Sequence, residues 1–199
     1  LFRACERVFG DRLMDEDDRA VFTNEMLAAL ALHGDVSWSK ASYDEDRRVM
    51  HGDFFRTDQA ADDRDYLPVP SMDTATRAMY DHLDVYNTEH AQQKLELVLF
   101  PQAVEQIARL CRVLRQPRGS ALLVGVGGTG KRTIARFASF VCGCSVHELK
   151  SGKSYGPSEF RDDIKLLYDE AGLEGRRVTF LVNEADIVHE AFLDDINNL

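Results

Sequence analysis

The feature that most constrains this chain is a glycine-rich loop that stands between an apolar run and a helical pattern. Residues 121–126 read ALLVGV, and residues 125–131 read GVGGTGK. A short apolar run bounded by glycines is typical of a parallel strand buried on both faces. A helix over about residues 131–142 is expected to follow the loop. Strand, loop and helix in this order predict one unit of an α/β domain.

Further strands and helices alternate after this unit. The runs SVHEL at 145–149 and RVTFLVNEAD at 177–186 are expected strands. Apolar residues at helical spacing predict a helix that Ser158 caps and Gly172 ends, and a last helix that is lined by Val188, Phe192, Ile196 and Leu199. The alternation predicts an α/β fold with a parallel sheet and flanking helices.

Helices are also expected upstream of the loop. Apolar spacing predicts one amphipathic helix through 79–86 and another that begins at Pro101 and stops before Pro117.

The first residues of the chain form a small helical segment of their own. An acidic cluster at 15–18 favours a helix N-terminus there, and the apolar spacing continues to about residue 30. From 33 to 70 the pattern gives way to Gly, Ser, Asp and Arg, which is typical of a long connector. We therefore expect a helical segment and connector over 1–66 and an α/β domain over 67–199.

The acidic composition limits the classes of partner. The 199 residues carry 24 Lys and Arg against 34 Asp and Glu, a formal net charge of −10. Nucleic-acid phosphates require clustered cations, so no nucleic-acid partner is expected. The four cysteines form no CxxC pair, which favours a reducing compartment. We find no signal peptide and no apolar run near the roughly 18 residues that cross a bilayer, and no membrane partner is expected. The sequence starts without Met and stops inside an expected helix, so we interpret it as a fragment.

The loop itself matches the pattern GxxxxGK in the context that the pattern requires, after a strand and before a helix. Backbone amides of 127–131 and the helix N-terminus are expected to surround the phosphates of a nucleotide, and Lys131 to reach the outer phosphates. The expected nucleotide-binding residues of the loop are Gly125, Val126, Gly127, Gly128, Thr129, Gly130 and Lys131.

The residues that would serve the metal ion are altered. Such loops place a Mg²⁺-binding hydroxyl after the Lys, but Arg132 stands there, and the hydroxyl of Thr133 lies about 100° further round the helix. Asn183 occupies the position of the acidic residue at the strand end, and its amide carries no charge. Glu184 follows and is the candidate catalytic base, with a solvated carboxylate at a strand end as the alternative interpretation. We also count Arg132, Thr133 and Asn183 among the nucleotide-binding candidates, and we predict no dedicated protein metal site.

Several stretches resemble the fourth AAA+ module of a dynein heavy chain, most like the axonemal type. The main stretch is RQPRGSALLVGVGGTGKRTIARFASFVCG. VYN and LVLFPQAVEQIARLCRVL lie upstream of it, and FLDDINNL lies downstream. ERVFGDRLMDEDDRAVF resembles the closing helices of the third module. The resemblance covers nearly the whole chain, and residues 115–140 are its most specific part.

The resemblance implies a P-loop AAA+ module in a ring of six, within a motor that ATP drives along microtubules. It implies ATP or ADP as cofactor, with Mg²⁺ whose ligands are altered here. The implied partners are neighbouring AAA+ modules of the same chain, microtubules, and dynein intermediate and light chains. The implied location is the cytoplasmic cytoskeleton, in the axoneme of a cilium or flagellum.

This sequence departs from the family where the metal would bind. Axonemal members commonly have Gln and then Ser after the Lys, and Asp at the position of Asn183, so the resemblance implies a regulatory site with weakened Mg²⁺ binding. AAA+ sheets have strand order 5-1-4-3-2, which implies unpaired edges for the strand at 121–126 and a poorly stable, inefficient ATPase in isolation. Two alternatives stay open: a structural spacer module that does not hydrolyse nucleotide, and a stand-alone P-loop ATPase unrelated to motors.

Overall fold

A computed structural model describes residues 5–6, 8–33, 50–149 and 155–198. The chain divides into two compact units, Leu1–Met50 and His51–Leu199. None of the described helices is long and apolar enough to cross a membrane.

The first unit is helical where it is described. A 3₁₀ turn, η1 (Gly10–Arg12), precedes the long helix α2 (Glu16–His33), whose first turn is acidic. The side chain of Asp15 accepts a hydrogen bond from the amide of Asp17 at 3.0 Å. Carboxylates at this end satisfy free amides and oppose the helix dipole, so the acidic cluster opens the helix as predicted.

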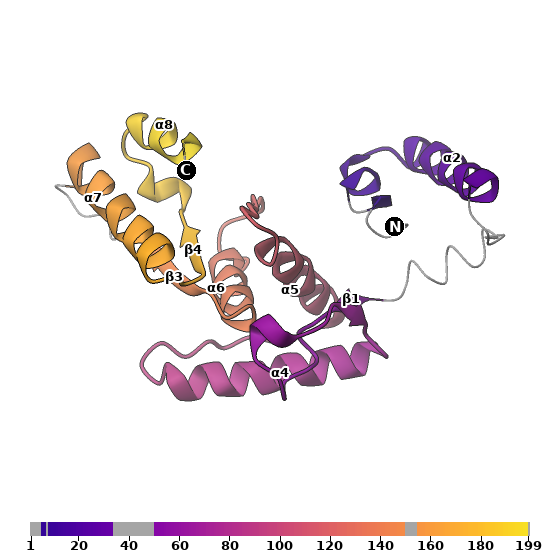
Figure 1. Ribbon diagram of the computed structural model, residues 1–199, viewed down its shortest axis with the longest axis horizontal. Coiled ribbons are helices and arrows are strands. Elements are labelled where there is room, and N and C mark those ends of the chain that lie inside the picture. The colour runs from indigo at the N-terminus through magenta and orange to yellow at the C-terminus, as the bar shows by residue number, and fades with distance from the viewer. Residues whose placement is uncertain (1–4, 7, 34–49, 150–154, 199) are drawn as a thin grey trace. The chain divides into compact units, whose positions relative to one another are not determined.

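Three helices form the first core of the second unit. These are α4 (Met72–Glu89), α5 (Pro101–Leu114) and α6 (Lys131–Val141), and α5 and α6 pack side by side with α4 across them (Figure 1). Ser71 caps α4 by accepting a hydrogen bond from the Thr74 amide at 3.1 Å. The side chains that are fully buried between these helices include Met79, Val104, Ile107 and Phe137. The predicted helices are confirmed.

A two-stranded parallel sheet joins this core to the last helices. β3 (Ser145–Glu148) pairs with β4 (Val178–Leu181) in the register Ser145 to Val178 and Glu148 to Leu181. The helix α7 (Pro157–Tyr168) and a π-helical turn, η3 (Asp169–Leu173), connect the two strands. A 3₁₀ turn, η4 (Glu184–Asp186), and α8 (Ala191–Asn197) follow β4. Both strands were expected, and their parallel pairing confirms the α/β class.

A second core lies between α7, α8 and the sheet. Phe160 on α7 stacks on Phe192 of α8 with ring centroids 4.3 Å apart, and both rings are fully buried. The predicted cap Ser158 and the predicted placement of Val188 on the last helix were wrong here. α7 begins after Gly156, whose amide donates to the Glu159 carboxylate at 3.0 Å, so the cap precedes Ser158. α8 begins at Ala191, and Val188 lies before it.

The segment 121–126 does not form the predicted strand. Within the described residues the parallel sheet contains β3 and β4 only. Leu122, Val124 and Val126 are 89%, 85% and 79% exposed. An apolar run becomes a strand only where a neighbour pairs its backbone and covers its side chains. The described part of the chain provides no such neighbour beside this run.

The second unit also begins earlier than the predicted boundary at 66. β1 (His51–Gly52) pairs antiparallel with β2 (Leu67–Pro68), and a 3₁₀ turn, η2 (Ala61–Asp63), lies between them. Phe54 is fully buried, and His82 on α4 forms a 2.8 Å hydrogen bond with its carbonyl. Residues 51–66 therefore pack with the α/β unit, although their polar composition is typical of a connector.

Candidate functional site

The glycine-rich loop has the backbone geometry of a phosphate-binding turn. Gly128 and Gly130 have φ angles of 79° and 75°, in the left-handed region that glycine adopts without strain. A Cβ atom added at Gly127, Gly128 or Gly130 would meet nothing within 4 Å. α6 begins directly after the loop, and the first amides of a helix have no intrahelical partner. The loop is therefore open on the side where an anion would meet free amides.

The Lys131 ammonium is held over this loop. Its Nζ donates to the carbonyl oxygens of Gly125 at 2.8 Å and Val126 at 2.7 Å. The Thr129 hydroxyl also donates to the Val126 carbonyl, at 2.9 Å. A cation above exposed glycines fits the phosphates of a nucleotide, because phosphate oxygens can replace the loop carbonyls as its partners. The structure thus brings the predicted loop residues together.

Arg132, which stands in the hydroxyl position, contacts a residue that the sequence pattern did not reveal. Its guanidinium forms an ion pair with Glu148, the last residue of β3. Arg136, one turn along α6, binds the same carboxylate, with Nη2 donating to Oε2 at 2.5 Å. Hydrogen bonds from Arg136 lower the pKa of Glu148, and burial opposes that shift. The hydrogen bond to Glu148 in turn raises the pKa of Arg136.

Glu148 had no sequence signal of its own. It lies 16 residues after Arg132, and a glutamate at the end of a short strand has no distinctive spacing. The packing of α6 against β3 brings Arg132 and Glu148 together. The sequence offered one clue: Arg132 and Arg136 are four residues apart and so share one face of the helix.

Asn183 and Glu184 follow β4. Because β3 and β4 are parallel, these two residues lie at the same edge of the sheet as Glu148, the last residue of β3. The Asn183 backbone amide and its side-chain amide both donate to Asp186 Oδ2, at 3.1 and 3.0 Å. The side-chain nitrogen of Asn183 is thus bonded within the turn η4. Glu184 is exposed, and Thr133 is half-buried on α6. In the described residues, no hydrogen bond or ion pair joins Thr133, Asn183 or Glu184 to the loop.

The described residues contain no cluster of three or more His, Cys, Asp or Glu side chains arranged to hold a metal. That finding concerns protein-only metal sites. A P-loop metal is bound mainly by phosphates, water and a hydroxyl. Magnesium binding at this loop therefore stays a prediction.

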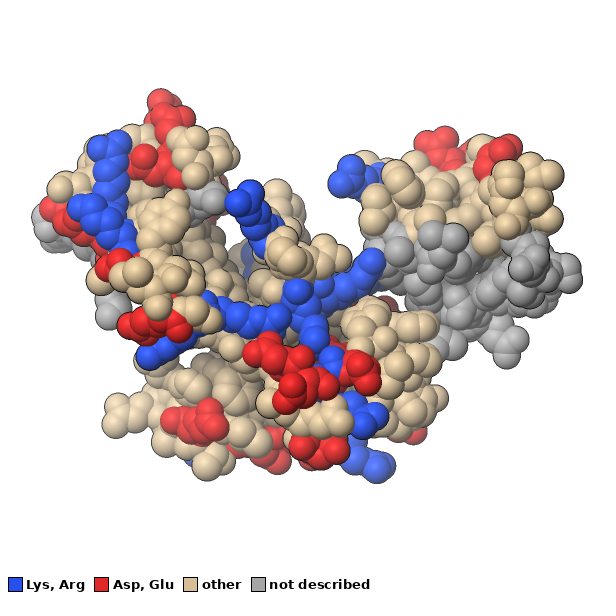
Figure 2. Space-filling view, in the orientation of Figure 1, with Lys and Arg blue, Asp and Glu red and all other residues tan. Residues whose placement is uncertain are grey.

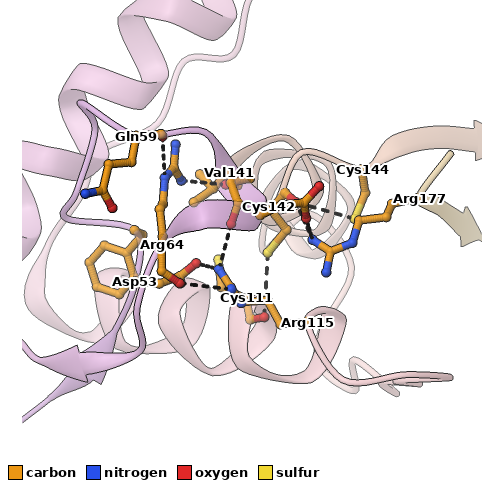
Figure 3. Close-up of polar contacts among 12 residues, drawn as sticks. Asp53, Gln59, Arg64, Cys111, Arg115, Val141, Cys142, Cys144 and Arg177 are labelled. Carbon is orange, nitrogen blue, oxygen red and sulfur yellow. Dashed lines mark hydrogen bonds and ion pairs between the residues drawn. The ribbon is translucent and has the colours of Figure 1, made fainter.

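A second polar cluster ties residues 51–66 to the helices (Figure 3). Arg115, at the end of α5, forms an ion pair with the buried Asp53. Its Nη1 and Nη2 also donate to the carbonyls of Ala61 at 3.1 Å and Arg64 at 3.2 Å. Arg64 donates to the Val141 carbonyl at 3.1 Å, at the end of α6. The sequence interpretation missed this cluster, because its members are far apart in the chain.

Two buried cysteines lie against these arginines. The thiol of Cys142 is 3.6 Å from the Cys111 carbonyl oxygen, to which it donates. A hydrogen bond from Cys111 lowers the pKa of Cys142, and the neighbouring Arg115, Arg177 and Arg64 add to that effect. The same hydrogen bond and burial raise the pKa of Cys111. Cys111 and Cys142 are each 1% exposed, so both thiols belong to the core.

Acidic and basic side chains adjoin one another on the surface of the second unit. Figure 2 shows Lys and Arg side chains in a band with Asp and Glu side chains directly against it. The ion pairs of Arg132 and Arg136 with Glu148, and of Arg161 with Asp195, are examples of this mixing. Cations that are already paired with carboxylates attract a polyanion weakly.

The comparisons with known proteins agree on one family. A family model described as the P-loop containing dynein motor region D4 matches residues 95–199. Over 195 residues the chain is 35% identical to dynein axonemal heavy chain 6 of Homo sapiens, covering 98% of this chain and 5% of that protein. It is 38% identical to dynein axonemal heavy chain 2 of Mus musculus and 36% identical to the dynein beta chain, flagellar outer arm, of Chlamydomonas reinhardtii. Each match covers 98% of this chain and 4% of the relative.

Proposed function

This chain belongs to the dynein heavy chain family, in its P-loop containing motor region D4, and on that premise we propose that it is a nucleotide-binding AAA+ module of an ATP-driven microtubule motor. The observation that carries the proposal is the open loop at 125–131 with the Lys131 ammonium held above it. The family assignment removes the alternative of a stand-alone ATPase unrelated to motors.

In this proposal the loop binds the phosphates of ATP or ADP. The backbone amides of 127–131 donate to the phosphate oxygens, and Lys131 turns from its two carbonyls toward the outer phosphates. When bound, ATP supplies a phosphoanhydride bond whose hydrolysis powers a motor. Glu184, exposed at the start of η4, is the proposed base that orients the attacking water.

We propose that the site is regulatory and binds Mg²⁺ weakly. Two features of the described residues support this. Arg132 places a guanidinium where a hydroxyl would bind the metal, and it is paired with Glu148. Asn183 is neutral, and its amide is used by Asp186. Arg132 therefore offers no oxygen to the metal, and Asn183 offers only a neutral amide oxygen in place of a carboxylate.

The setting of the module is also a proposal, since the chain spans about 5% of the length of the first curated relative it matches. Those relatives are named as axonemal and flagellar proteins. We propose that the parent protein acts in the cytoskeleton of a cilium or flagellum, with neighbouring AAA+ modules, microtubules and dynein intermediate and light chains as partners. The first compact unit, residues 1–50, would then belong to the preceding module, and residues 51–199 would form part of the next.

A second candidate function is a holding site that binds nucleotide without hydrolysing it. The neutral side chain of Asn183, whose nitrogen donates to Asp186, favours this candidate, because it lacks the charge with which a strand-end carboxylate would retain a metal-bound water. Such a module transmits shape changes between its neighbours. Slow nucleotide exchange, over hours, would distinguish it from a site that turns over.

The test is a titration of fluorescent ATP and ADP analogues into the full-length protein, with and without Mg²⁺. Lys131→Ala removes the loop cation and is expected to abolish binding at this site. Lys165→Ala is the matched control, because Lys165 is an exposed lysine on α7 paired with Asp162. Equal binding by the unaltered protein and Lys131→Ala would refute the proposed function.

A further inference from the structure

We propose that Glu148 is a positioning residue that holds the Arg132 guanidinium at the nucleotide edge of the sheet and releases it to bound phosphates while Arg136 keeps the carboxylate paired. This inference rests on the proposed nucleotide site. It goes beyond that proposal by assigning Glu148 and Arg136 roles in controlling how strongly the site binds phosphate.

The location of the three residues is the first reason. Arg132 follows Lys131 directly and lies in the first turn of α6, and Glu148 is the last residue of β3. In open α/β sheets, ligands bind at the carboxyl ends of the strands. Glu148 lies at that end, next to Leu181 of β4 in the strand register. The Arg132–Glu148 pair therefore joins the start of the loop helix to the ligand edge.

The two arginines bind Glu148 unequally, which is the second reason. Arg136 uses Nε toward Oε1 and Nη2 toward Oε2, so it engages both carboxylate oxygens. Arg132 uses Nη2 alone, toward Oε2. The exposed fractions of the side chains are 30% for Arg136, 45% for Arg132 and 14% for Glu148. Arg132 is thus the more weakly held and more solvent-accessible of the two.

Release of Arg132 is inexpensive because Glu148 stays paired. A half-buried carboxylate that loses its only cation is strongly destabilising. Here the bidentate Arg136 remains on both oxygens after Arg132 leaves. A phosphate oxygen at the loop offers Arg132 a second anionic partner, and guanidinium binds phosphate through parallel hydrogen bonds. The nucleotide and Glu148 then compete for one guanidinium.

Competition of this kind predicts opposite effects of the two substitutions. Glu148→Gln removes the competitor, so nucleotide should bind about two- to fivefold more tightly, the range expected for an exposed ion pair. Arg132→Gln removes the cation, so nucleotide should bind roughly tenfold more weakly, with the largest loss in buffer without Mg²⁺. In the double variant, Glu148→Gln should have no further effect on affinity.

The experiment is a double-mutant cycle at these two positions, with a fluorescent ATP analogue and the full-length protein. Lys131→Ala provides the blank for this site. Asp195→Asn is the matched control, because it also removes a carboxylate from a helix arginine, Arg161 of α7, and its affinity should match the unaltered protein. Thermal unfolding checks each variant. If Glu148→Gln does not fold, Arg132→Gln still tests the inference by itself, because it alters an exposed side chain.

The outcomes separate this inference from the proposed function. Tighter binding by Glu148→Gln that disappears in the Arg132→Gln background supports the competition. Site-specific binding by the unaltered protein, with the same affinity in both single variants, overturns the inference and leaves the proposed function standing. Weaker binding by Glu148→Gln also overturns it. No binding above the Lys131→Ala blank overturns both.

Discussion

Replacing Arg115 with alanine should release residues 51–66 from the α/β unit. Arg115 forms an ion pair with Asp53, whose side chain is only 4% exposed, and donates to the carbonyls of Ala61 and Arg64. No other ion pair is formed by Asp53 within the described residues. The substitution therefore leaves a buried carboxylate without its cation and two carbonyls without their donors.

The magnitude follows from the burial. Leaving a buried charge unpaired typically costs about 3–5 kcal/mol, and that range already includes the loss of its hydrogen bonds. Since each 1.4 kcal/mol corresponds to about a tenfold change in an equilibrium constant, local opening should become at least about a hundredfold more frequent. Asp53→Asn in the Arg115→Ala background removes the orphan charge and should recover most of this loss.

Hydrogen exchange measures this opening directly. The amides of Arg56, Gln59 and Asp63 donate hydrogen bonds within the segment, so their exchange reports whether it has opened. Arg161→Ala is the control, because Arg161 is 61% exposed and its pair with Asp195 should contribute no more than about 1 kcal/mol. Equal exchange rates at these amides in Arg115→Ala and Arg161→Ala would refute the reasoning.

Three further predictions concern the loop, the ion pairs and the thiols. Gly130→Ala forces a Cβ into a left-handed φ of 75°, at a cost of about 1–2 kcal/mol, and should weaken nucleotide binding about tenfold in a titration; unchanged affinity would count against the loop geometry. The Arg136 pair lowers the pKa of Glu148, so its stabilisation is full above the ordinary glutamate pKa of about 4.3 and is lost as pH falls through the lower folded pKa. The difference in unfolding temperature between the unaltered protein and Arg136→Ala should accordingly shrink on acidification below about pH 4, and a constant difference would contradict it. Iodoacetamide should modify the half-buried Cys144 before Cys142, which is 1% exposed, and mass spectrometry showing the reverse order would mean that thiol acidity outweighs burial.

The helices could be predicted from the sequence because their signals are local. Pro101 and the loop glycines mark helix starts by backbone chemistry that acts within a few residues. The cap of α7 was placed two residues late, at Ser158, because a side chain from inside the helix, Glu159, satisfies the Gly156 amide and makes Gly156 the cap.

Contacts between distant residues could not be predicted in this way. The boundary at residue 66 was drawn from polar composition, yet Asp53 and Arg115 hold the preceding residues on α5. The strand at 121–126 was drawn from an apolar run, yet a strand requires neighbours, and Leu122 and Val124 are exposed in the described structure.

The sequence by itself determined the order of the long helices and of the two parallel strands, the phosphate-binding loop and the position of Lys131 within it, because each depends on spacing within one short stretch. Only the tertiary structure decided that Arg132 is held by Glu148, that Arg136 shares the carboxylate, and that the Asn183 amide is committed to Asp186. The physical reason is that a charged side chain takes whichever partner the packing places within reach. That partner is fixed by how α6 lies on β3 and by how η4 turns after β4.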